Sequence, residues 1–542
     1  MRFLPLLSLP LYLLFVGLIS GLSFTFGLIS SMFASLIRMT FAYIFSLIFA
    51  LIYGYYAAST LRRERILLPV LDILQSVPIL GFFPVAVVFL INIFGKREIG
   101  IELASVFLIF TSQAWNMAFG VYEGMTTIPR EAKEAIFSFG GSNWFLVKKL
   151  LLPACVPKLV YNSMLSWAGG WYFLVACEII SLGPLNYRLP GIGSIIYQAS
   201  EDGNYSLLFL ALGLLIIIIT LMEIYIWRPL AQWAEIYKYE VTGTITHRSP
   251  IPKILRSLVV SKAYLLWMER LSRASDRVFS FILRIRKRLI ITLRYLFYFV
   301  LLFLGSLILY QFIRPLSRDI SSISPKIILS LPFGLILSAF RLFVAYSIAL
   351  AWTIPVAILI AEREGLAKIL IPVSSILASI PATAFFPIIV LLVLSTVSSM
   401  NLASILLVLT GMQWYILFNV ISGFKGVPQD LKEAVRGFGV KGFAYWRKLL
   451  IPAALPSIIT GSITGWGGGW NALIVSEYVV FKGQVFKTLG IGSLLSEVTY
   501  KKGSPSEILI VLTFLVLSIT LINKFIWRRL YHLVQRKYII EG

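Results

Sequence analysis

Long apolar segments follow one another along this chain, and they limit its fold more than any other feature. A helix needs about 18 or more mainly apolar residues to cross the ~30 Å hydrocarbon core of a bilayer. Of the 542 residues, 58% are hydrophobic and 13% are charged, and the mean hydropathy is +0.88. Soluble domains carry about twice that share of charged residues. The sequence therefore excludes a soluble globular protein and predicts an all-α polytopic membrane protein.

The second half of the chain repeats the first. The segment PREAKEAIFSFGGSNW around Glu134 matches PQDLKEAVRGFGVKGF around Glu433, an offset of 433 − 134 = 299 residues. Towards the N-terminus the offset becomes 303. Such self-similarity predicts two equivalent structural units. Further pairs at these two offsets are Trp171 with Trp470, Glu178 with Glu477, Arg38 with Arg341, Pro78 with Pro381 and Pro84 with Pro387.

Each copy contains six apolar segments that we predict to be membrane helices. Because six is an even number, both copies cross the membrane in the same direction, which predicts a parallel internal repeat of about 12 helices. We divide the chain into a first domain (1–237), a linker (238–289) and a second domain (290–542). The predicted helices are 4–28, 33–57, 69–94, 100–121, 158–180 and 206–229, then 290–313, 335–361, 371–395, 401–422, 457–480 and 506–528.

Basic residues predict the orientation. Arg62, Arg63 and Arg65 follow the second helix, and Arg130 and Lys133 follow the fourth, which places these loops in the cytoplasm and both termini with them. The chain has 48 Lys and Arg against 24 Asp and Glu, a net charge of +24. In a membrane protein this excess points to anionic headgroups and the lipid bilayer rather than to nucleic acid.

The region between the copies is the most basic part of the chain. Residues 238–294 carry 13 Lys or Arg and 3 Asp or Glu, with leucines interleaved. A basic amphipathic segment of this kind is typical of one that lies along the inner leaflet, and a regulatory or docking role is the alternative.

One polar loop keeps its pattern in both copies. Apolar residues at i, i+3, i+4 and i+7 predict a short amphipathic helix in each. Gly140 and Gly439 follow the stripes, where a helix commonly ends in a left-handed residue. Such a helix packs on its own domain or enters a groove in a partner protein, and the pattern does not separate the two. The stripes are Ala132, Ala135, Ile136 and Phe139, and Leu431, Ala434, Val435 and Phe438.

These loops resemble those of the membrane subunits of ATP-binding-cassette importers. The family motif has Glu-Ala-Ala, a Gly six residues after the Glu, and a later apolar-Pro pair. Ile136 and Val435 depart from the third motif position, but the Glu-to-Pro spacing is 19 in both copies. The matching residues are Glu134, Ala135, Gly140, Leu152 and Pro153, and Glu433, Ala434, Gly439, Ile451 and Pro452.

The resemblance implies two tandem six-helix type I importer domains. Each loop would be a coupling helix on one of two ATPase subunits, with Phe139 and Phe438 among the coupling residues. An extracytoplasmic substrate-binding protein would complete the transporter in the cytoplasmic membrane. The chain has no G-x-x-x-x-G-K-[ST] phosphate loop, so we expect a non-catalytic permease without a cofactor.

Within these importers the chain is similar to the nitrate, sulfonate, taurine and bicarbonate group. The similar stretches are SLIRMTFAY, WAGGWYFLVACE and GIGSII, with SAFRLFVAY, WGGGWNALIVSE and GIGSLL in the second copy. This resemblance implies transport of a small anion by alternating access between two fused halves. A non-anionic solute is the alternative within the same class.

Prolines interrupt the third predicted helix of each copy. Each removes a backbone hydrogen bond, and the freed carbonyl must face protein or a water-filled cavity. The prolines therefore either line a path or only kink the helix. The candidate path residues are Ser76, Pro78, Pro84 and Trp171, with Ser379, Pro381, Pro387 and Trp470 in the second copy.

Two arginine and glutamate pairs recur near the predicted outer boundary. Arg38 lies near the outer end of a helix that runs inwards, and Glu178 lies near the outer end of one that runs outwards. The two can therefore meet, as can Arg341 and Glu477. Ionisable residues in a membrane are candidates for function. We favour structural ion pairs over anion ligation by the arginines.

Two other classes of protein are alternatives. An ion-coupled secondary transporter can also have twelve helices in two repeats, but it would use carboxylates in the middle of helices. A membrane enzyme has little support, because the two histidines, His247 and His532, form no catalytic group. Cys155 and Cys177 lack neighbours at metal-binding spacing, so no metal site is expected.

Overall fold

The structure is a computed structural model that describes residues 22–237 and 324–538, except 77, 95–96, 141, 183–184, 398, 482–483 and 500–504. The linker 238–289, the predicted helix 290–313 and most of the predicted helix 4–28 lie outside the described residues. The chain forms two compact units. Unit 1 combines Met1–Leu221 with Ser324–Gly542, so it contains most of both copies of the repeat, and unit 2 is Met222–Ile323.

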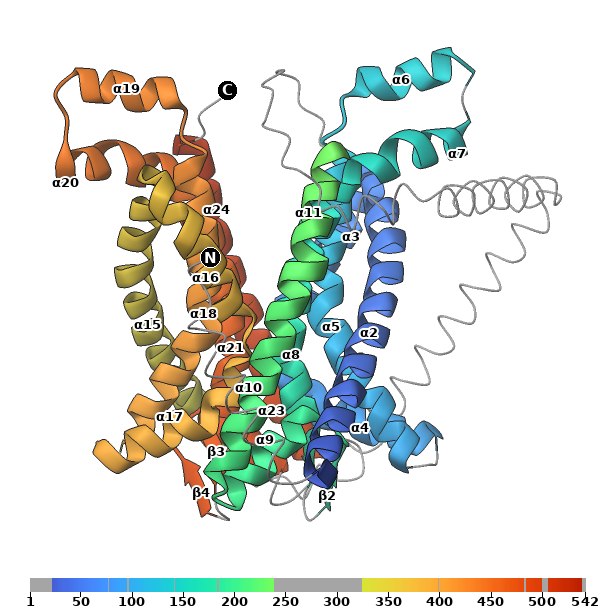
Figure 1. Ribbon diagram of the computed structural model, residues 1–542, viewed down its shortest axis with the longest axis vertical. Helices are drawn as coiled ribbons and strands as arrows, with labels where there is room; N and C mark the ends of the chain where they lie inside the picture. Colours follow the sequence, from blue (N-terminus) through green and yellow to red (C-terminus); the bar gives the residue numbers. More distant parts are fainter. Residues whose placement is uncertain are drawn as a thin grey trace. The chain divides into compact units, whose positions relative to one another are not determined.

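The first copy is built from long helices and short connecting ones (Figure 1). Its elements in unit 1 are α2 (Leu22–Ala58), α3 (Leu61–Ser76), α4 (Ile79–Phe94), α5 (Arg97–Thr126), α6 (Arg130–Ser138), α7 (Asn143–Leu146), the π-helical turn η1 (Val147–Leu151), α8 (Leu152–Cys177), β1 (Ile179–Leu182), β2 (Leu185–Arg188), α9 (Ile192–Glu201) and α10 (Tyr205–Met222). The described part of unit 2 continues as η2 (Glu223–Trp227), α11 (Arg228–Ala234) and η3 (Glu235–Tyr237).

The second copy repeats this order. Its elements are α15 (Pro325–Glu362), α16 (Glu364–Ser379), α17 (Ala382–Thr396), α18 (Met400–Lys425), α19 (Gln429–Gly437), α20 (Gly442–Tyr445), η5 (Trp446–Leu450), α21 (Ile451–Ser476), β3 (Tyr478–Phe481), β4 (Gln484–Lys487), α22 (Ile491–Glu497), α23 (Pro505–Ile522), η7 (Asn523–Trp527) and α24 (Arg528–Tyr538).

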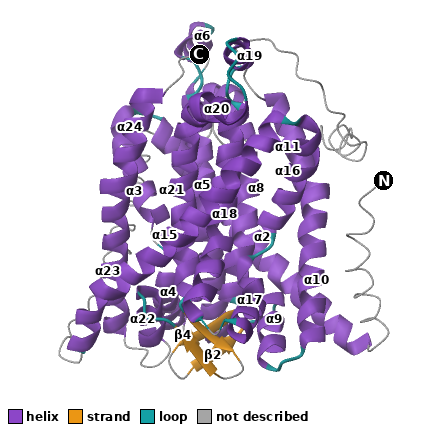
Figure 2. Ribbon diagram, turned by 90° about the vertical axis from the view of Figure 1, so that its left-hand side faces the viewer, coloured by secondary structure: helices purple, strands orange, loops and turns teal. Residues whose placement is uncertain are grey.

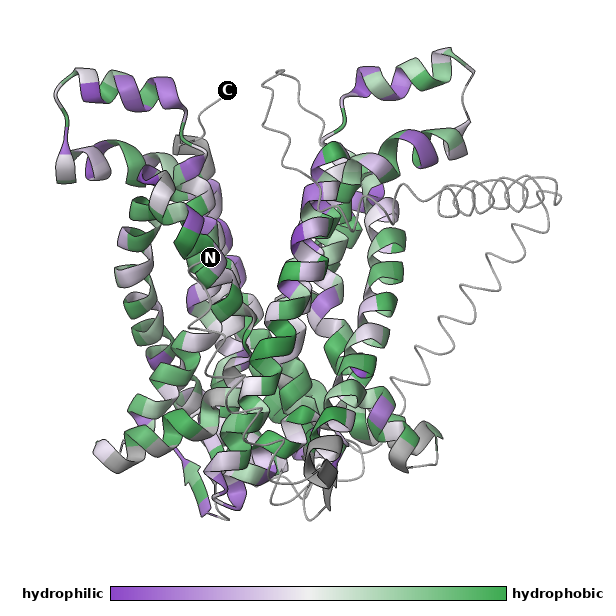
Figure 3. Cartoon of the chain, in the orientation of Figure 1, coloured by the Kyte–Doolittle hydropathy of each residue, from purple (hydrophilic) through white to green (hydrophobic). Residues whose placement is uncertain are grey.

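Several of these helices are long and apolar enough to cross a membrane. Among the described residues seven meet both conditions, and the green of hydrophobic residues runs along the long helices in Figure 3. The prediction of a helical membrane protein is therefore confirmed. The seven spans are Gly27–Ala58, Ile99–Thr126, Tyr205–Tyr237, Pro325–Glu362, Met400–Lys425, Gly442–Ser476 and Ser506–Val534.

The third predicted helix of each copy is not one helix but two. The segment predicted at 69–94 is divided between α3 and α4, and Pro78 lies between them rather than inside a helix. In the second copy Ile380 and Pro381 have extended backbones between α16 and α17. Proline lacks an N–H and also disfavours a helical residue before it, so the helix ends there.

Two short β-hairpins were not predicted. β1 pairs antiparallel with β2, with Ile179 opposite Arg188, and β3 pairs with β4, with Tyr478 opposite Lys487. The predicted helices at 158–180 and 457–480 ran into these strands, since the apolar run continues beyond the true helix ends. Figure 2 shows the strands together at one end of unit 1, opposite α6 and α19. We call these the strand end and the loop end.

Within each copy the long helices pack closely. α5 contacts α2 and α8, and α18 contacts α15 and α21. Gly124 permits one of these approaches, because a Cβ there would lie 2.5 Å from the Cα of Cys155 on α8. Between the copies, α4 contacts α21 and α23, and α17 contacts α8 and α9. Figure 1 shows α4, α9 and α17 towards the strand end.

Candidate functional site

The repeated loops form helices that end as the sequence predicts. α6 and α19 each follow a proline and end two residues before a glycine, with Phe139 and Phe438 at the C-caps. Gly140 and Gly439 both have φ of 77°, in the left-handed region. The Gly140 N–H donates to Phe137 O at 2.9 Å and that of Gly439 donates to Arg436 O at 3.0 Å. The predicted terminal glycines are thus confirmed.

The apolar stripes of these helices are only partly covered. Phe139 is 93% exposed and Phe438 is 86% exposed, although large aromatic side chains are usually covered. Glu134 and Glu433 are also exposed, whereas Ile136 is half-buried. The described part of the chain therefore leaves the last residue of each apolar stripe, Phe139 or Phe438, uncovered. The loop end presents the two similar helices α6 and α19 (Figure 1), and each is followed by an exposed phenylalanine.

In the second loop a carboxylate of the preceding long helix anchors the loop helix. Glu362, at the end of α15, accepts hydrogen bonds from Arg436 on α19 and from the Tyr445 hydroxyl at 3.4 Å. The Lys432 Nζ lies 3.8 Å from the same carboxylate. In the first copy Lys133 instead donates to the backbone oxygen of Met125 at 3.3 Å.

At the strand end of the first copy, Arg38 and Glu178 form a buried ion pair. Arg38 Nη1 lies 2.9 Å from Glu178 Oε1, and their side chains are 6% and 0% exposed. Glu102 on α5 adds a second carboxylate, with both oxygens 2.7 Å from the Nε and Nη2 of Arg38. Every nitrogen of this guanidinium therefore has a carboxylate partner.

The second copy repeats the pair with different neighbours. Arg341 Nη1 lies 2.6 Å from Glu477 Oε1. Asn401 occupies the place of the second carboxylate, and its Oδ1 accepts from Arg341 Nε at 2.9 Å. The Nη2 donates to Thr488 Oγ1 at 2.9 Å and to Leu489 O at 2.7 Å. The first network thus carries one more negative charge than the second.

The paired glutamates also hold the next helix. Glu178 accepts from Ser35 Oγ at 2.5 Å and from the Gly193 N–H at 2.6 Å, at the N-terminus of α9. Ser35 Oγ in turn accepts from the Ile192 N–H at 3.0 Å. A carboxylate at a helix N-terminus satisfies free N–H groups and complements the helix dipole. A Cβ at Gly191 would overlap this carboxylate, so the approach needs glycine.

The same arrangement in the second copy uses Ser338, which donates to Glu477 Oε1 at 2.6 Å and accepts from the Ile491 N–H at 2.9 Å. Our sequence reasoning missed both serines. A signal was present, because Ser35 and Ser338 lie one helical turn before Arg38 and Arg341 and share their offset of 303.

The helix breaks contact the opposite copy reciprocally. The Ile79 N–H at the start of α4 donates to Asn471 Oδ1 on α21 at 2.7 Å. The Thr383 Oγ1 at the start of α17 donates to Tyr172 O on α8 at 3.0 Å. Tyr172 and Asn471 are repeat partners at the offset of 299. Sequence reasoning missed these residues too.

The candidate path residues lie around these breaks. Pro78 and Pro381 are buried at the two breaks, and Trp171 and Trp470 are fully buried in α8 and α21. Ser76, Pro84, Ser379 and Pro387 lie in α3, α4, α16 and α17, but their side chains are outside the described part. Among the described residues no three His, Cys, Asp or Glu side chains gather as metal ligands would.

One protein-family model matches both copies of the repeat. The family described as "Binding-protein-dependent transport system inner membrane component" matches residues 50–227 and again residues 353–537. The chain belongs to this family. This permease therefore has two tandem transmembrane domains of the predicted type, and it is a multi-pass inner-membrane protein. Each matched range contains one of the exposed loop helices.

Several curated relatives of this permease are named for nitrate, bicarbonate or taurine transport. The nitrate import permease protein NrtB of Synechocystis sp. is 29% identical over 186 residues, covering 34% of this chain and 64% of the relative. The bicarbonate transport system permease protein CmpB of Synechococcus elongatus is 29% identical over 35% of this chain and 65% of its own length. The taurine transport system permease protein TauC of Escherichia coli is 26% identical over 29% and 56%. The chain spans just under two thirds of the length of the first two.

Proposed function

We propose that this permease is the membrane subunit of an ATP-driven importer for a small anion. The observation that carries the proposal is the pair of α6 and α19, two equivalent helices at one end of unit 1 whose terminal phenylalanines are uncovered. The anion class is supported by the names of the relatives, which transport nitrate, bicarbonate and taurine.

In this proposal each loop helix docks on one ATPase subunit. An exposed phenylalanine that enters a groove of a partner gains ~2 kcal/mol or more from burial, and hot spots at interfaces are typically of this kind. The exposed Glu134 and Glu433 then contact the partner from the polar faces. The loop end lies in the cytoplasm, as its basic residues suggest, and both termini are on that side.

A substrate-binding protein would meet the strand end, on the outer side. The copies contact each other through α4, α9 and α17, which lie towards that end, while α6 and α19 lie on opposite sides in Figure 1. This arrangement supports alternating access, in which the halves close at one end and then at the other as the ATPases move the loop helices.

We propose that the two buried ion pairs are structural. Arg38 and Arg341 already have partners for their guanidinium nitrogens, and an unscreened glutamate would repel an anion. We place the substrate path at the helix breaks around Pro78 and Pro381, because backbone groups there are outside the regular hydrogen bonding of a helix.

The ion-coupled transporter remains the second candidate. It would need a carboxylate whose protonation follows transport. Glu178 and Glu477 have completely buried side chains, but each is paired with an arginine, which disfavours such a role. The uncovered loop helices favour the ATP-driven importer.

The decisive experiment reconstitutes the permease with its ATPase subunits. Phe139→Ala and Phe438→Ala together should reduce ATP-driven uptake by at least about tenfold, because each loses ~2 kcal/mol of docking energy. Complex mass should show two ATPase subunits per permease, and fewer after the substitutions.

Phe340→Ala is the matched control, since Phe340 is also exposed but lies on α15, away from both loop helices. It should leave uptake unchanged. Uptake that persists with inactive ATPases and follows an ion gradient would refute the proposal.

A further inference from the structure

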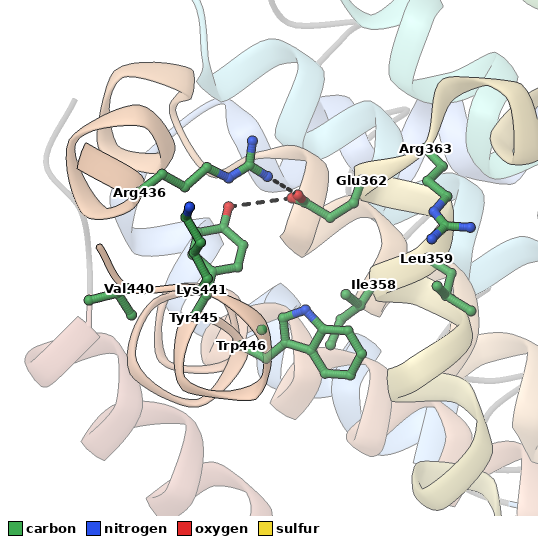
Figure 4. Close-up of a pocket in the computed structure, with 10 residues that line it drawn as sticks. Ile358, Leu359, Glu362, Arg363, Arg436, Val440, Lys441, Tyr445 and Trp446 are labelled. Atoms are coloured by element: carbon green, nitrogen blue, oxygen red, sulfur yellow. Dashed lines mark hydrogen bonds and ion pairs between the residues drawn. The ribbon is translucent and has the colours of Figure 1, made fainter. Parts of the chain in front are cut away.

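A pocket of about 350 Å³ lies between the end of α15 and the loop that follows α19 (Figure 4). Glu362 at the end of α15 and Arg363 directly after it line the pocket on one side, while Arg436, Lys441 and Tyr445 line it from the second loop. In Figure 4 Glu362 faces Arg436 and Tyr445, which belong to a loop far from α15 in the sequence, and Arg363 and Lys441 lie to either side of this group. The pocket therefore bridges a long helix and the loop that carries α19.

The charges that line this pocket do not balance. Its single carboxylate, Glu362, is already bound by Arg436 and Lys432. The side chains of Arg363 and Lys441 have no ion-pair or hydrogen-bond partner among the described side chains, and both residues are exposed. Two positive charges therefore remain to be neutralised at one small opening.

Apolar surface adjoins these cations. Ile358 and Leu359 line the pocket from the last turns of α15, and Trp446 covers its other side. The site thus offers cations at the rim and an apolar wall below. This combination fits an anionic group carried on a less polar body, such as a phosphate ester.

The first copy does not reproduce the cations. At offsets of 303 and 299, Arg363 corresponds to Thr60 and Lys441 to Ser142, while Phe137 replaces Arg436. The positive pocket is therefore a feature of the second copy, and the duplicated fold does not require it.

We propose that this pocket binds a phosphate-bearing anion through Arg363 and Lys441. The phosphate ester belongs either to an anionic phospholipid of the surrounding leaflet or to a soluble metabolite. A bound phosphate joins α15 to the loop after α19, so it holds the second loop helix in place while the first is unaffected. Occupancy of the site would then restrain α19 but not α6.

The test uses the full-length permease, delipidated in detergent. Native mass spectrometry measures the binding of phosphatidylglycerol, phosphatidylcholine and glycerol 3-phosphate to the wild type and to Arg363→Thr/Lys441→Ser, which gives the pocket the residues of the first copy. The control Arg447→Thr/Lys448→Ser removes the same charge from neighbouring exposed positions that do not line the pocket. The unfolding temperature of each variant verifies its fold.

We expect the pocket variant to bind phosphatidylglycerol about 10 to 30 times more weakly, with the control near wild type. A loss confined to glycerol 3-phosphate would support the site and identify a soluble ligand. If the pocket variant does not fold, Lys441→Ser alone should still weaken binding severalfold. Equal binding by wild type and pocket variant, or an equal loss in the control, would overturn the proposal.

Discussion

Glu178 and Glu477 each join three elements through a single carboxylate. Glu178 binds Arg38 and Ser35 from α2, and its other oxygen accepts from the first turn of α9. Burying a carboxylate is costly, and only several strong hydrogen bonds compensate for it. The network therefore fixes how α2, α8 and α9 meet and has little tolerance for the loss of a member.

The first prediction concerns the coupling of these charges. Arg38→Ala or Glu178→Ala should each reduce the free energy of unfolding by about 3–5 kcal/mol, since each strands a buried charge, and the double variant should cost much less than the sum. Unfolding of the purified chain, followed by circular dichroism over a double-mutant cycle, measures the coupling energy.

Glu102 offers the matched comparison, because its side chain is 41% exposed and water replaces a lost partner. Its coupling to Arg38 should be only about 0–1 kcal/mol. If Arg38→Ala instead abolished transport at unchanged stability, with additive double variants, the arginine would be an anion ligand and the structural role would be wrong.

At this scale the sequence predicted which residues pair but not how. Repeated placement near one boundary was enough to bring Arg38 to Glu178. Ser35 escaped notice because a serine in an apolar helix is unremarkable by type. Glu102 and Asn401 escaped because their contact depends on the rotation of α5 and α18 about their axes, which an almost uniformly apolar sequence does not specify.

At the scale of elements, the helix breaks show how a local rule depends on distant residues. Pro78 frees backbone groups, but a break is stable only if an exposed N–H finds another acceptor. The Ile79 N–H finds Asn471 from the other copy. The sequence predicted an interruption of the helix at Pro78. Whether the helix kinks or breaks completely depends on the tertiary partner of the Ile79 N–H.

The second prediction is that Asn471→Leu loosens the break between α3 and α4. An unpaired buried N–H costs about 1–3 kcal/mol, so amides near residue 79 should exchange with solvent roughly 5 to 100 times faster. Hydrogen–deuterium exchange with mass spectrometry measures this on the peptide that covers the break.

Asn419→Leu is the control, because among the described residues the Asn419 side chain donates only to Tyr415 O, within its own helix. It should leave exchange around residue 79 unchanged. Equal acceleration in both variants would mean that the Asn471 contact does not hold the break.

The loop helices α6 and α19 were predicted best among the elements. Their stripes and terminal glycines are local signals that need no tertiary information. The hairpins β1–β2 and β3–β4 were missed for the opposite reason, because four-residue apolar strands directly after an apolar helix leave no change in hydropathy.

At the scale of the whole molecule, the duplication predicted two domains of one family, and both matched ranges confirm them. Periodicity gave the order of helices within each copy. It gave no information on the faces between copies, where α4 meets α21 and α17 meets α8. Those faces carry the same apolar residues as faces that meet lipid.

The third prediction follows from these direct contacts. A protease site inserted after His247 and then cleaved should leave two fragments that co-purify in detergent, because the contacts between the copies do not pass through that point. Affinity purification by a tag on one fragment measures the recovery of the other. Fragments that separate in wild-type sequence, under conditions that keep the uncut chain folded, would show that the copies need the connection.

The unequal partners of the two arginines have a consequence for any molecule that binds at the strand end. If the two copies were identical, an asymmetric protein could bind the strand end in two equivalent orientations related by a rotation of half a turn. Glu102 places a half-exposed negative charge on one side, where Asn401 is neutral. The two orientations then differ in electrostatic energy, because the charge of the binding surface is different on the two copies. A protein with one basic lobe would therefore bind in a single orientation, with that lobe next to Glu102.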